Sequence, residues 1–191
     1  MIEFEVYMQG AVGRVPAVTY WILGLLLLIG VGVIYLYVNQ NRCNHNDNNN
    51  VNQKHNWEQS VARLMLAEWI MLVFCSTVVF RSTMAESAIS LVPLSSYFYI
   101  AENSYLLEVT VINMLNILMF VPIGILSGCS FKELSWKIVI KIGIGLSVTI
   151  ELFQFLFRRG LCEIDDVIHN VIGCMIGYAI SLLLFKIFKY L

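Results

Sequence analysis

The feature that most constrains this chain is a series of apolar stretches, each about 20 residues long. They cover residues 17–38, 61–80, 106–126, 134–155 and 167–188. A helix of about that length crosses the hydrocarbon core of a bilayer with its backbone hydrogen bonds satisfied internally. The stretches are too long and too continuous for barrel strands, which have about ten alternating residues. The sequence therefore predicts an all-α membrane protein, a bundle of about five transmembrane helices.

Composition supports this class and argues against several others. Hydrophobic residues make up 59% of the 191 residues and charged residues only 13%, against about a quarter charged in soluble domains. The 12 Lys and Arg balance the 13 Asp and Glu, so no excess of positive charge favours a nucleic-acid partner. The five cysteines are scattered without a C-x-x-C pair, which argues against a disulfide framework or a zinc site. We expect no metal and no cofactor.

The N-terminal region is expected to be separate from the rest of the chain. Residues 1–16 carry two Glu against one Arg, and no small-x-small cleavage site follows the first apolar stretch, so we interpret that stretch as a span rather than a signal peptide. Nine of the 18 residues in 39–56 are Asn, which predicts a solvated linker. Three potential metal ligands lie in it: Cys43, His45 and His55. Their spacing matches no regular ligand set. The predicted division is therefore residues 1–60, a span plus linker, and residues 61–191, a membrane domain of four spans.

Lys and Arg in short loops predict orientation because they accumulate on the cytoplasmic side. With five spans, one side holds eight: Arg42, Lys54, Arg63, Lys132, Lys137, Lys141, Lys186 and Lys189. The other side holds four: Arg14, Arg81, Arg158 and Arg159. We therefore predict a multi-pass membrane protein with the N-terminus outside and the C-terminus inside. Residues 81–105 and 158–165 would then face outward.

Polar residues inside the spans are informative because each costs several kcal/mol unless it is partnered. Three sets recur at helical steps, one on each of the last three spans: Asn113, Asn116 and Phe120; Glu151, Gln154 and Arg158; and Asp166, Asn170, Gly173 and Gly177. Each set should share one helix face. Pro122 is expected to interrupt and kink the third span, between Phe120 and Gly124.

The last two spans are joined by a short connection and should pack as an antiparallel hairpin, which brings Glu151 close to Asn170. With the third span beside them, Asn116 would be the floor of an outward-opening polar cleft. We expect its rim to consist of Arg158, Arg159, Glu163, Asp165 and Asp166.

Each of these residues also has a structural interpretation. One Asp of the pair Asp165 and Asp166 could cap the last helix. Asn116 and Asn170 could join helices by hydrogen bonds, and Gly173 and Gly177 are typical of close helix packing. Arg158 and Arg159 could form a solvated turn. Glu68 could pair with Lys141, whereas a carboxylate at Glu151 has no packing role and marks a functional site.

Three segments carry a resemblance to a known family. They are Asn116 to Gly124, with the pattern Asn-x-x-x-Phe-x-Pro-x-Gly; Glu151 to Gln154, with Glu-x-x-Gln; and Asp165 to Gly173, with Asp-Asp-Val-x-x-Asn-x-x-Gly. In this order and spacing the chain resembles the VanZ-like family over residues 63–178. A weaker match is Ser90 to Leu94, which looks like the family's Asn-Leu-x-Pro-Phe loop. Ser90, Ile123 and Glu163 depart from the usual Asn, Phe and Asp.

The resemblance implies a small integral protein of a bacterial cell membrane that lowers susceptibility to teicoplanin-type glycopeptides. We expect binding or masking of a lipid-linked cell-wall precursor, or of the lipoglycopeptide itself, beside membrane lipid. An alternative is an intramembrane hydrolase or transferase in which Glu151 is the general base near Asp166, and Arg158 or Arg159 holds a phosphate. A third possibility is a proton-coupled transporter with Glu151 as relay, although no inverted repeat is visible.

Overall fold

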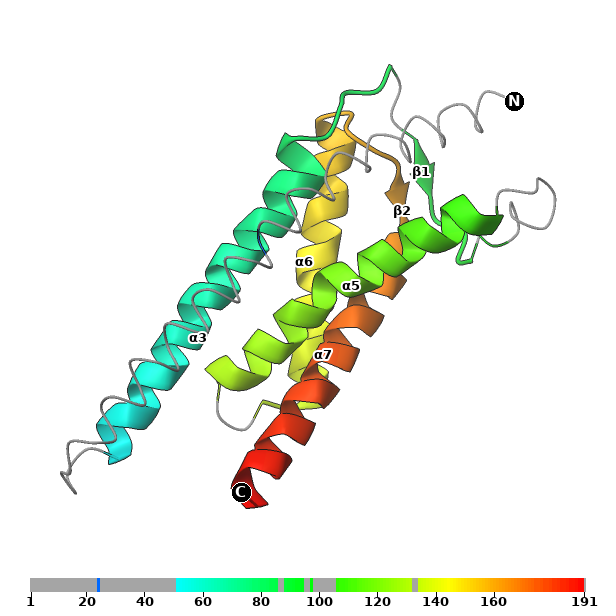
Figure 1. Cartoon of the computed structure of the whole chain (residues 1–191). Helices are drawn as coiled ribbons and strands as arrows, with labels where there is room; N and C mark the ends of the chain where they lie inside the picture. Colours follow the sequence, from blue (N-terminus) through cyan, green and yellow to red (C-terminus); the bar gives the residue numbers. More distant parts are fainter. Residues whose placement is uncertain are drawn as a thin grey trace.

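The described part of the chain is mostly helical. The computed structural model describes Gly24 and residues 51–85, 88–94, 97, 106–131 and 134–190. Four long helices dominate (Figure 1): α3 (Val51–Phe74), α5 (Leu106–Ser130), α6 (Trp136–Leu156) and α7 (Ile164–Tyr190). A π-helical turn, η1 (Cys75–Val79), continues α3. Two short strands, β1 (Ile89–Ser90) and β2 (Cys162–Glu163), pair in parallel.

The helices alternate in direction from α5 to α7, and the small sheet lies at one end of the bundle. Figure 1 shows η1, the C-terminal end of α6 and the N-terminal end of α7 gathered near β1 and β2. We call this the sheet end. The C-terminus lies at the opposite end (Figure 1).

Length and hydropathy confirm the membrane class. Four helical segments are long and apolar enough to cross a bilayer: Gln59–Val79, Thr110–Ser130, Trp136–Leu156 and Ile164–Lys186. They coincide with the last four predicted spans. The first predicted span, residues 17–38, lies outside the described residues except for Gly24, which is helical and buried. A Cβ at Gly24 would lie 2.7 Å from Leu72 Cδ1, so this residue lies against α3.

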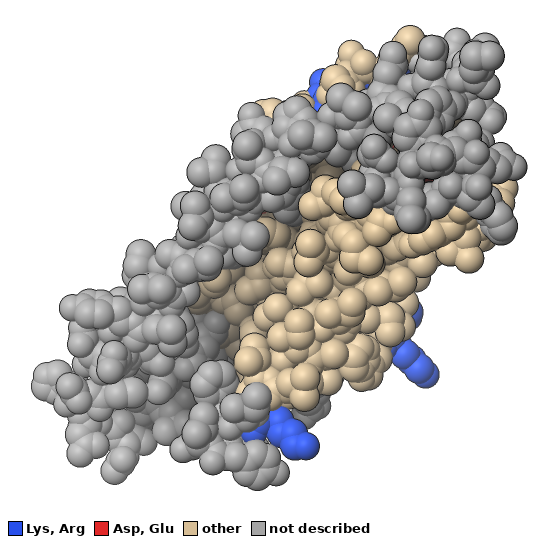
Figure 2. Space-filling view, turned by 45° about the vertical axis from the view of Figure 1, so that its right-hand side comes forward, with Lys and Arg blue, Asp and Glu red and all other residues tan. Residues whose placement is uncertain are grey.

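Large apolar side chains on all four helices remain exposed on the outer faces of the bundle, among them Leu64, Met71, Leu118, Ile144, Leu152 and Leu183. An apolar surface of this extent is a liability in water but is expected in lipid. On the face in Figure 2, blue Lys and Arg side chains project mainly from the lower part of the described surface, away from the sheet end.

The closest packing in the bundle is between α5 and α7, and glycines make it possible. A Cβ at Gly173 would collide with the Ile117 carbonyl oxygen, and one at Gly177 with the Val121 carbonyl oxygen. A Cβ at Gly124 would collide with the backbone of α7 at the Cys174 carbonyl. Because the obstructing atoms belong to the backbone, no side-chain rotation could relieve these contacts. The packing interpretation of the glycines is confirmed.

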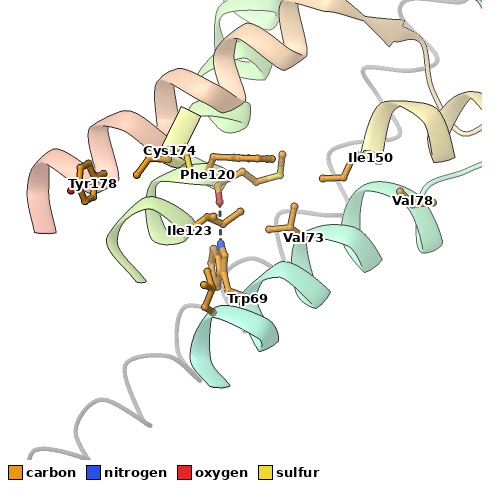
Figure 3. Close-up of a cluster of buried hydrophobic side chains, with 11 residues drawn as sticks. Trp69, Val73, Val78, Phe120, Ile123, Ile150, Cys174 and Tyr178 are labelled. Carbon is orange, nitrogen blue, oxygen red and sulfur yellow. Dashed lines mark hydrogen bonds between the residues drawn. The ribbon is translucent and has the colours of Figure 1, made fainter. Parts of the chain in front are cut away.

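The apolar core lies where α3, α5, α6 and α7 meet (Figure 3), and it includes Trp69, Phe120, Ile123, Ile150 and Cys174. Phe120 is completely buried. The Trp69 indole Nε1 donates a hydrogen bond to the Met119 carbonyl at 3.0 Å (Figure 3), which joins α3 to α5.

Two sequence expectations about helix limits are wrong. Pro122 does not interrupt its helix, because α5 runs without a break from Leu106 to Ser130. Proline leaves the Leu118 carbonyl without its usual N–H donor, a loss that spanning helices tolerate when neighbouring helices pack against them. The linker expected over residues 39–56 is also too long, since α3 begins at Val51. Adding a residue to a helix costs little free energy once packing has fixed the turns that follow it, so α3 begins among the polar residues that precede the apolar stretch.

Candidate functional site

The polar residues predicted on the last three spans come together in one buried group near the sheet end. We define this polar cluster as Asn116 of α5; Ser147, Glu151 and Gln154 of α6; Glu163 of β2; and Asp165, Asp166 and Asn170 of α7. Each of these residues is at most 8% exposed. Burial of so many polar groups in a membrane protein is costly without partners and is typical of functional sites.

Helix α7 supplies the centre of the cluster, because its polar residues reach both neighbouring helices. Asn116 Nδ2 donates to Asp166 Oδ1 at 2.5 Å, which links α5 to the first turn of α7. One turn further, Asn170 Nδ2 donates to Ser147 Oγ at 2.8 Å, which links α7 to α6. The carboxylates in the first turn also face the positive end of the helix dipole.

Glu151 lies within α6, as the sequence predicted, and is only 3% exposed. Its Oε2 accepts a hydrogen bond from the backbone N–H of Glu163 at 3.1 Å. This bond connects the carboxylate to β2, beyond the turn that follows α6. Glu151 therefore holds the hairpin between α6 and α7 closed and is itself held in one position.

The segment before α5 is attached to α7 over the cluster. The Leu94 N–H donates to Asp165 Oδ1 at 2.5 Å, and the Tyr97 hydroxyl lies 2.9 Å from His169 Nε2. The β1 and β2 register, with Ile89 opposite Cys162, extends this attachment. Asp165 therefore binds a loop rather than forming a solvated rim.

Sequence reasoning missed His169, Tyr97 and Ser147. His169 is buried and stands three residues after Asp166, while Ser147 stands four residues before Glu151. Both lie at helical steps from residues that were identified, and that spacing could have revealed them. Nothing in the sequence links Tyr97 to His169, because that contact spans 72 positions.

The two arginines at the end of α6 differ from the expectation. Helix α6 ends at Leu156, and Arg158 is exposed with a φ of 51°, so Arg158 does not share a helix face with Glu151 and Gln154. The chain has already turned out of the helix before that position. Arg159 Nη1 donates to the carbonyls of Val78 and Arg81, each at 3.1 Å, and to that of Val79.

These bonds make Arg159 a cap for the end of α3 and η1, whose last carbonyls have no helical partners. Gln154 acts nearby, since its Nε2 donates to the Thr77 carbonyl at 3.1 Å. Arg81 is 5% exposed, and a Cβ at Gly160 would lie 2.6 Å from its Nη1.

The cluster is closed rather than an open cleft. Of the five expected rim residues, Glu163, Asp165 and Asp166 are buried, and β1 with the following residues attaches over them. Four buried polar atoms of α5, α6 and α7 have no hydrogen-bond partner in the described part of the chain: Asn113 Nδ2, Gln154 Oε1, His169 Nδ1 and Asn170 Oδ1. Among the described residues, no group of three His, Cys, Asp or Glu side chains is arranged to hold a metal ion.

Cys162 marks the partly accessible side of the cluster. Burial raises the pKa of its thiol above 9.0, and the nearby carboxylates of Glu151, Asp166 and Glu163 raise it further. The thiol is half-buried. Cys162 therefore lies close to three carboxylates of the cluster.

Comparison with known proteins shows which family this chain is similar to. The VanZ/LLP1 family model matches residues 21–186, a wider region than the residues 63–178 that carry the resemblance. Protein VanZ of Enterococcus faecium is 37% identical over 62 residues, which cover 32% of this chain and 38% of that protein. The aligned part thus spans well under half of the relative. No solved structure gives a significant match.

Proposed function

Because this chain belongs to the VanZ/LLP1 family, we propose that it lowers susceptibility to teicoplanin-type glycopeptides in a bacterial membrane. It does so by binding or masking a cell-wall precursor or the drug. The observation that carries this proposal is the polar cluster, in which side chains of α5, α6 and α7 meet close to one end of the bundle. Its position near a membrane surface suits a ligand that has a polar head and an apolar part.

The distribution of charge supports an outward-facing sheet end. Lys137, Lys141 and Lys186 lie on the opposite half of the described bundle, near the start of α6 and the end of α7. Positive residues of short loops favour the cytoplasmic side. With that orientation the C-terminus is cytoplasmic, and the polar cluster is within reach of precursors and drugs at the outer surface.

The arrangement favours binding over catalysis. Asn116, Ser147 and Asn170 hold one another or Asp166 by direct side-chain bonds, as expected for a rigid recognition site. The hydrolase or transferase alternative needs an arginine to hold a phosphate. Arg159 instead donates to backbone carbonyls, and Arg158 is exposed outside the cluster.

The test is a susceptibility assay in a glycopeptide-sensitive Gram-positive host that expresses the chain. Glu151→Gln, Asp166→Asn and Asn170→Ala should each return teicoplanin susceptibility to that of cells without the gene, at unchanged membrane levels. The matched control is Thr149→Val, because Thr149 lies on the exposed face of the same helix and its hydroxyl donates to the Gly145 carbonyl of that helix. Wild-type chain that leaves susceptibility unchanged at full expression would refute the proposal.

A further inference from the structure

The segment that attaches over the polar cluster is apolar on its outer side. We call residues 88–94 the cover segment. Four of its side chains are large, aliphatic and between 51% and 69% exposed: Ile89, Leu91, Val92 and Leu94. The fifteen residues 87–101 include no Asp, Glu, Lys or Arg. An uncharged segment that exposes several large aliphatic side chains is unfavourable in water and is typical of an interaction surface.

The contacts of the cover segment with α7 fix its depth relative to the candidate span Ile164–Lys186. Figure 1 shows β1 beside β2 at the start of α7, and Ser90 pairs with Glu163, the residue directly before that span. The Leu94 N–H then donates to Asp165 Oδ1 at 2.5 Å. Asp165 is already the second residue of the span. Successive contacts therefore move along α7 toward the membrane and not away from it.

Tyr97 continues this course beyond the cover segment. Its hydroxyl lies 2.9 Å from Nε2 of His169, in the second turn of α7. Tyr is typical of membrane–water interfaces, where its ring lies among apolar groups and its hydroxyl has a polar partner. The chain from β1 to Tyr97 thus lies beside the beginning of a span.

The level of the cover segment corresponds to the edge of the hydrocarbon core. The candidate span in α7 has 23 residues and is therefore about 34 Å long, whereas the hydrocarbon core is about 30 Å thick. Its first turn, which binds Leu94, consequently lies close to the boundary between headgroups and acyl chains. Apolar side chains inserted at this boundary stabilise association with a bilayer.

The backbone of the cover segment has the protein partners that a position near lipid requires. The Cys162 N–H donates to the Ala88 carbonyl at 3.0 Å, and the Leu94 N–H is bound by Asp165. Because the protein holds the backbone, the aliphatic side chains remain on the outer surface.

This outer surface continues the lipid-facing surface of the bundle. Two candidate spans, Gln59–Val79 and Trp136–Leu156, also end at the sheet end. The residues that directly follow them, Phe80 and Phe157, are exposed large hydrophobic residues as well. Apolar surface thus extends past the limits of the spans at this end of the bundle, as expected where helices leave the hydrocarbon core.

We propose that the cover segment lies at the boundary between headgroups and acyl chains of the leaflet at the sheet end, with its four exposed aliphatic side chains against lipid. The partner of this surface is the bilayer itself. The cover over the polar cluster is then held on one side by α7 and on the other by lipid. The inference is independent of the proposed function, because it holds for either orientation of the chain.

Photocrosslinking identifies what contacts the surface. The photoreactive amino acid p-benzoylphenylalanine replaces Leu91 or Val92 in the full chain, which is irradiated in phosphatidylcholine nanodiscs. Mass spectrometry of its peptides then identifies the adducts. Leu91 and Val92 are 69% and 61% exposed, so the larger side chain should be tolerated at both, and each position tests the inference without the other.

Two control positions bracket the expected result. Leu118 is 61% exposed in the middle of the candidate span Thr110–Ser130 and reports contact with lipid. Thr83 is exposed and reports contact with water. Its neighbour Met84 donates its N–H to the carbonyl of Arg158, past the end of α6, which places Thr83 beyond the spans.

Leu91 and Val92 should each form phosphatidylcholine adducts with a yield within about threefold of that at Leu118, and Thr83 should give at least about tenfold fewer, as expected for insertion at the bilayer boundary. Fragmentation of the adducts should place the new bond on acyl chains or glycerol. Equal lipid yields at Leu91 and Thr83, or bonds confined to the choline group, would overturn the inference. Crosslinks to a second copy of the chain, or to another segment of the same chain, in place of lipid would overturn it as well.

Discussion

Replacing Gly177 by alanine should separate α5 from α7. A Cβ at Gly177 would collide with the Val121 carbonyl oxygen and would lie 2.9 Å from both the Val121 carbonyl carbon and the Ile125 nitrogen. All three are backbone atoms, so the helices themselves must move apart. Overpacking of this kind costs about 3 kcal/mol, and alanine returns about 1 kcal/mol of helix propensity. The expected net loss of stability is about 2 kcal/mol.

The matched control is Gly145→Ala on α6. Gly145 is exposed, and no described atom lies within 4 Å of the Cβ that alanine would add. The same helix-propensity gain of about 1 kcal/mol applies there without a collision. The two variants should therefore differ by about 3 kcal/mol in free energy of unfolding.

Thermal unfolding in detergent at one fixed scan rate measures the difference, because unfolding of membrane proteins is commonly irreversible. For a chain of this size, about 2 kcal/mol lowers Tm by roughly 4–8 °C. A second readout is Cys174, which is fully buried next to the contact and should react faster with maleimide in Gly177→Ala. Equal melting of Gly177→Ala and Gly145→Ala would show that the α5 and α7 backbones are not in contact, contrary to the structure.

Three further predictions use other parts of the fold. Because the pKa of the Cys162 thiol is raised, its modification by maleimide should be slower at neutral pH than that of an ordinary thiol and should speed up as pH rises. Glu151→Gln removes a charge that raises this pKa, so it should speed the reaction at neutral pH. An unchanged rate would contradict the closeness of Glu151 to Cys162. Arg159→Ala removes the donors to the carbonyls at the end of η1 and should destabilise the protein by about 1–3 kcal/mol in the same melting assay. Arg159→Lys should give an intermediate Tm. A wild-type Tm for Arg159→Ala would refute the capping role. Trp69→Phe removes the indole donor to the Met119 carbonyl and should cost about 0.6 kcal/mol for the hydrogen bond, the average measured between spanning helices, in addition to the cost of the smaller ring in the core. A wild-type Tm for Trp69→Phe would contradict this role.

The limits of the spans were predictable because hydropathy and length act locally. The fourth stretch, expected over residues 134–155, is α6 at Trp136–Leu156. Spacing within a helix was equally informative, since the helical steps brought Asn116, Glu151, Asp166 and Asn170 to buried faces. These inferences need only the helix period and the cost of polar groups in lipid.

The features that sequence reasoning missed depend on backbone atoms far away in the chain. Arg159 was expected to hold a ligand because a guanidinium suits phosphate, yet its partners are carbonyls about 80 positions earlier. The pairing of Ile89 with Cys162 likewise joins two loops with no shared pattern. Which unsatisfied helix end an arginine caps follows only from how the helices are arranged.

Packing and polar site are coupled through adjacent residues of the same two helices. Ile117, whose carbonyl contacts Gly173, follows Asn116 directly, and Asn116 binds Asp166. Gly173 in turn lies one turn beyond Asn170, which binds Ser147 of α6. The glycine contact therefore fixes the register at which α5 and α7 present their polar groups, because backbone atoms in contact leave little freedom to slide. Close packing in this chain sets the geometry of the polar cluster as well as the stability of the bundle.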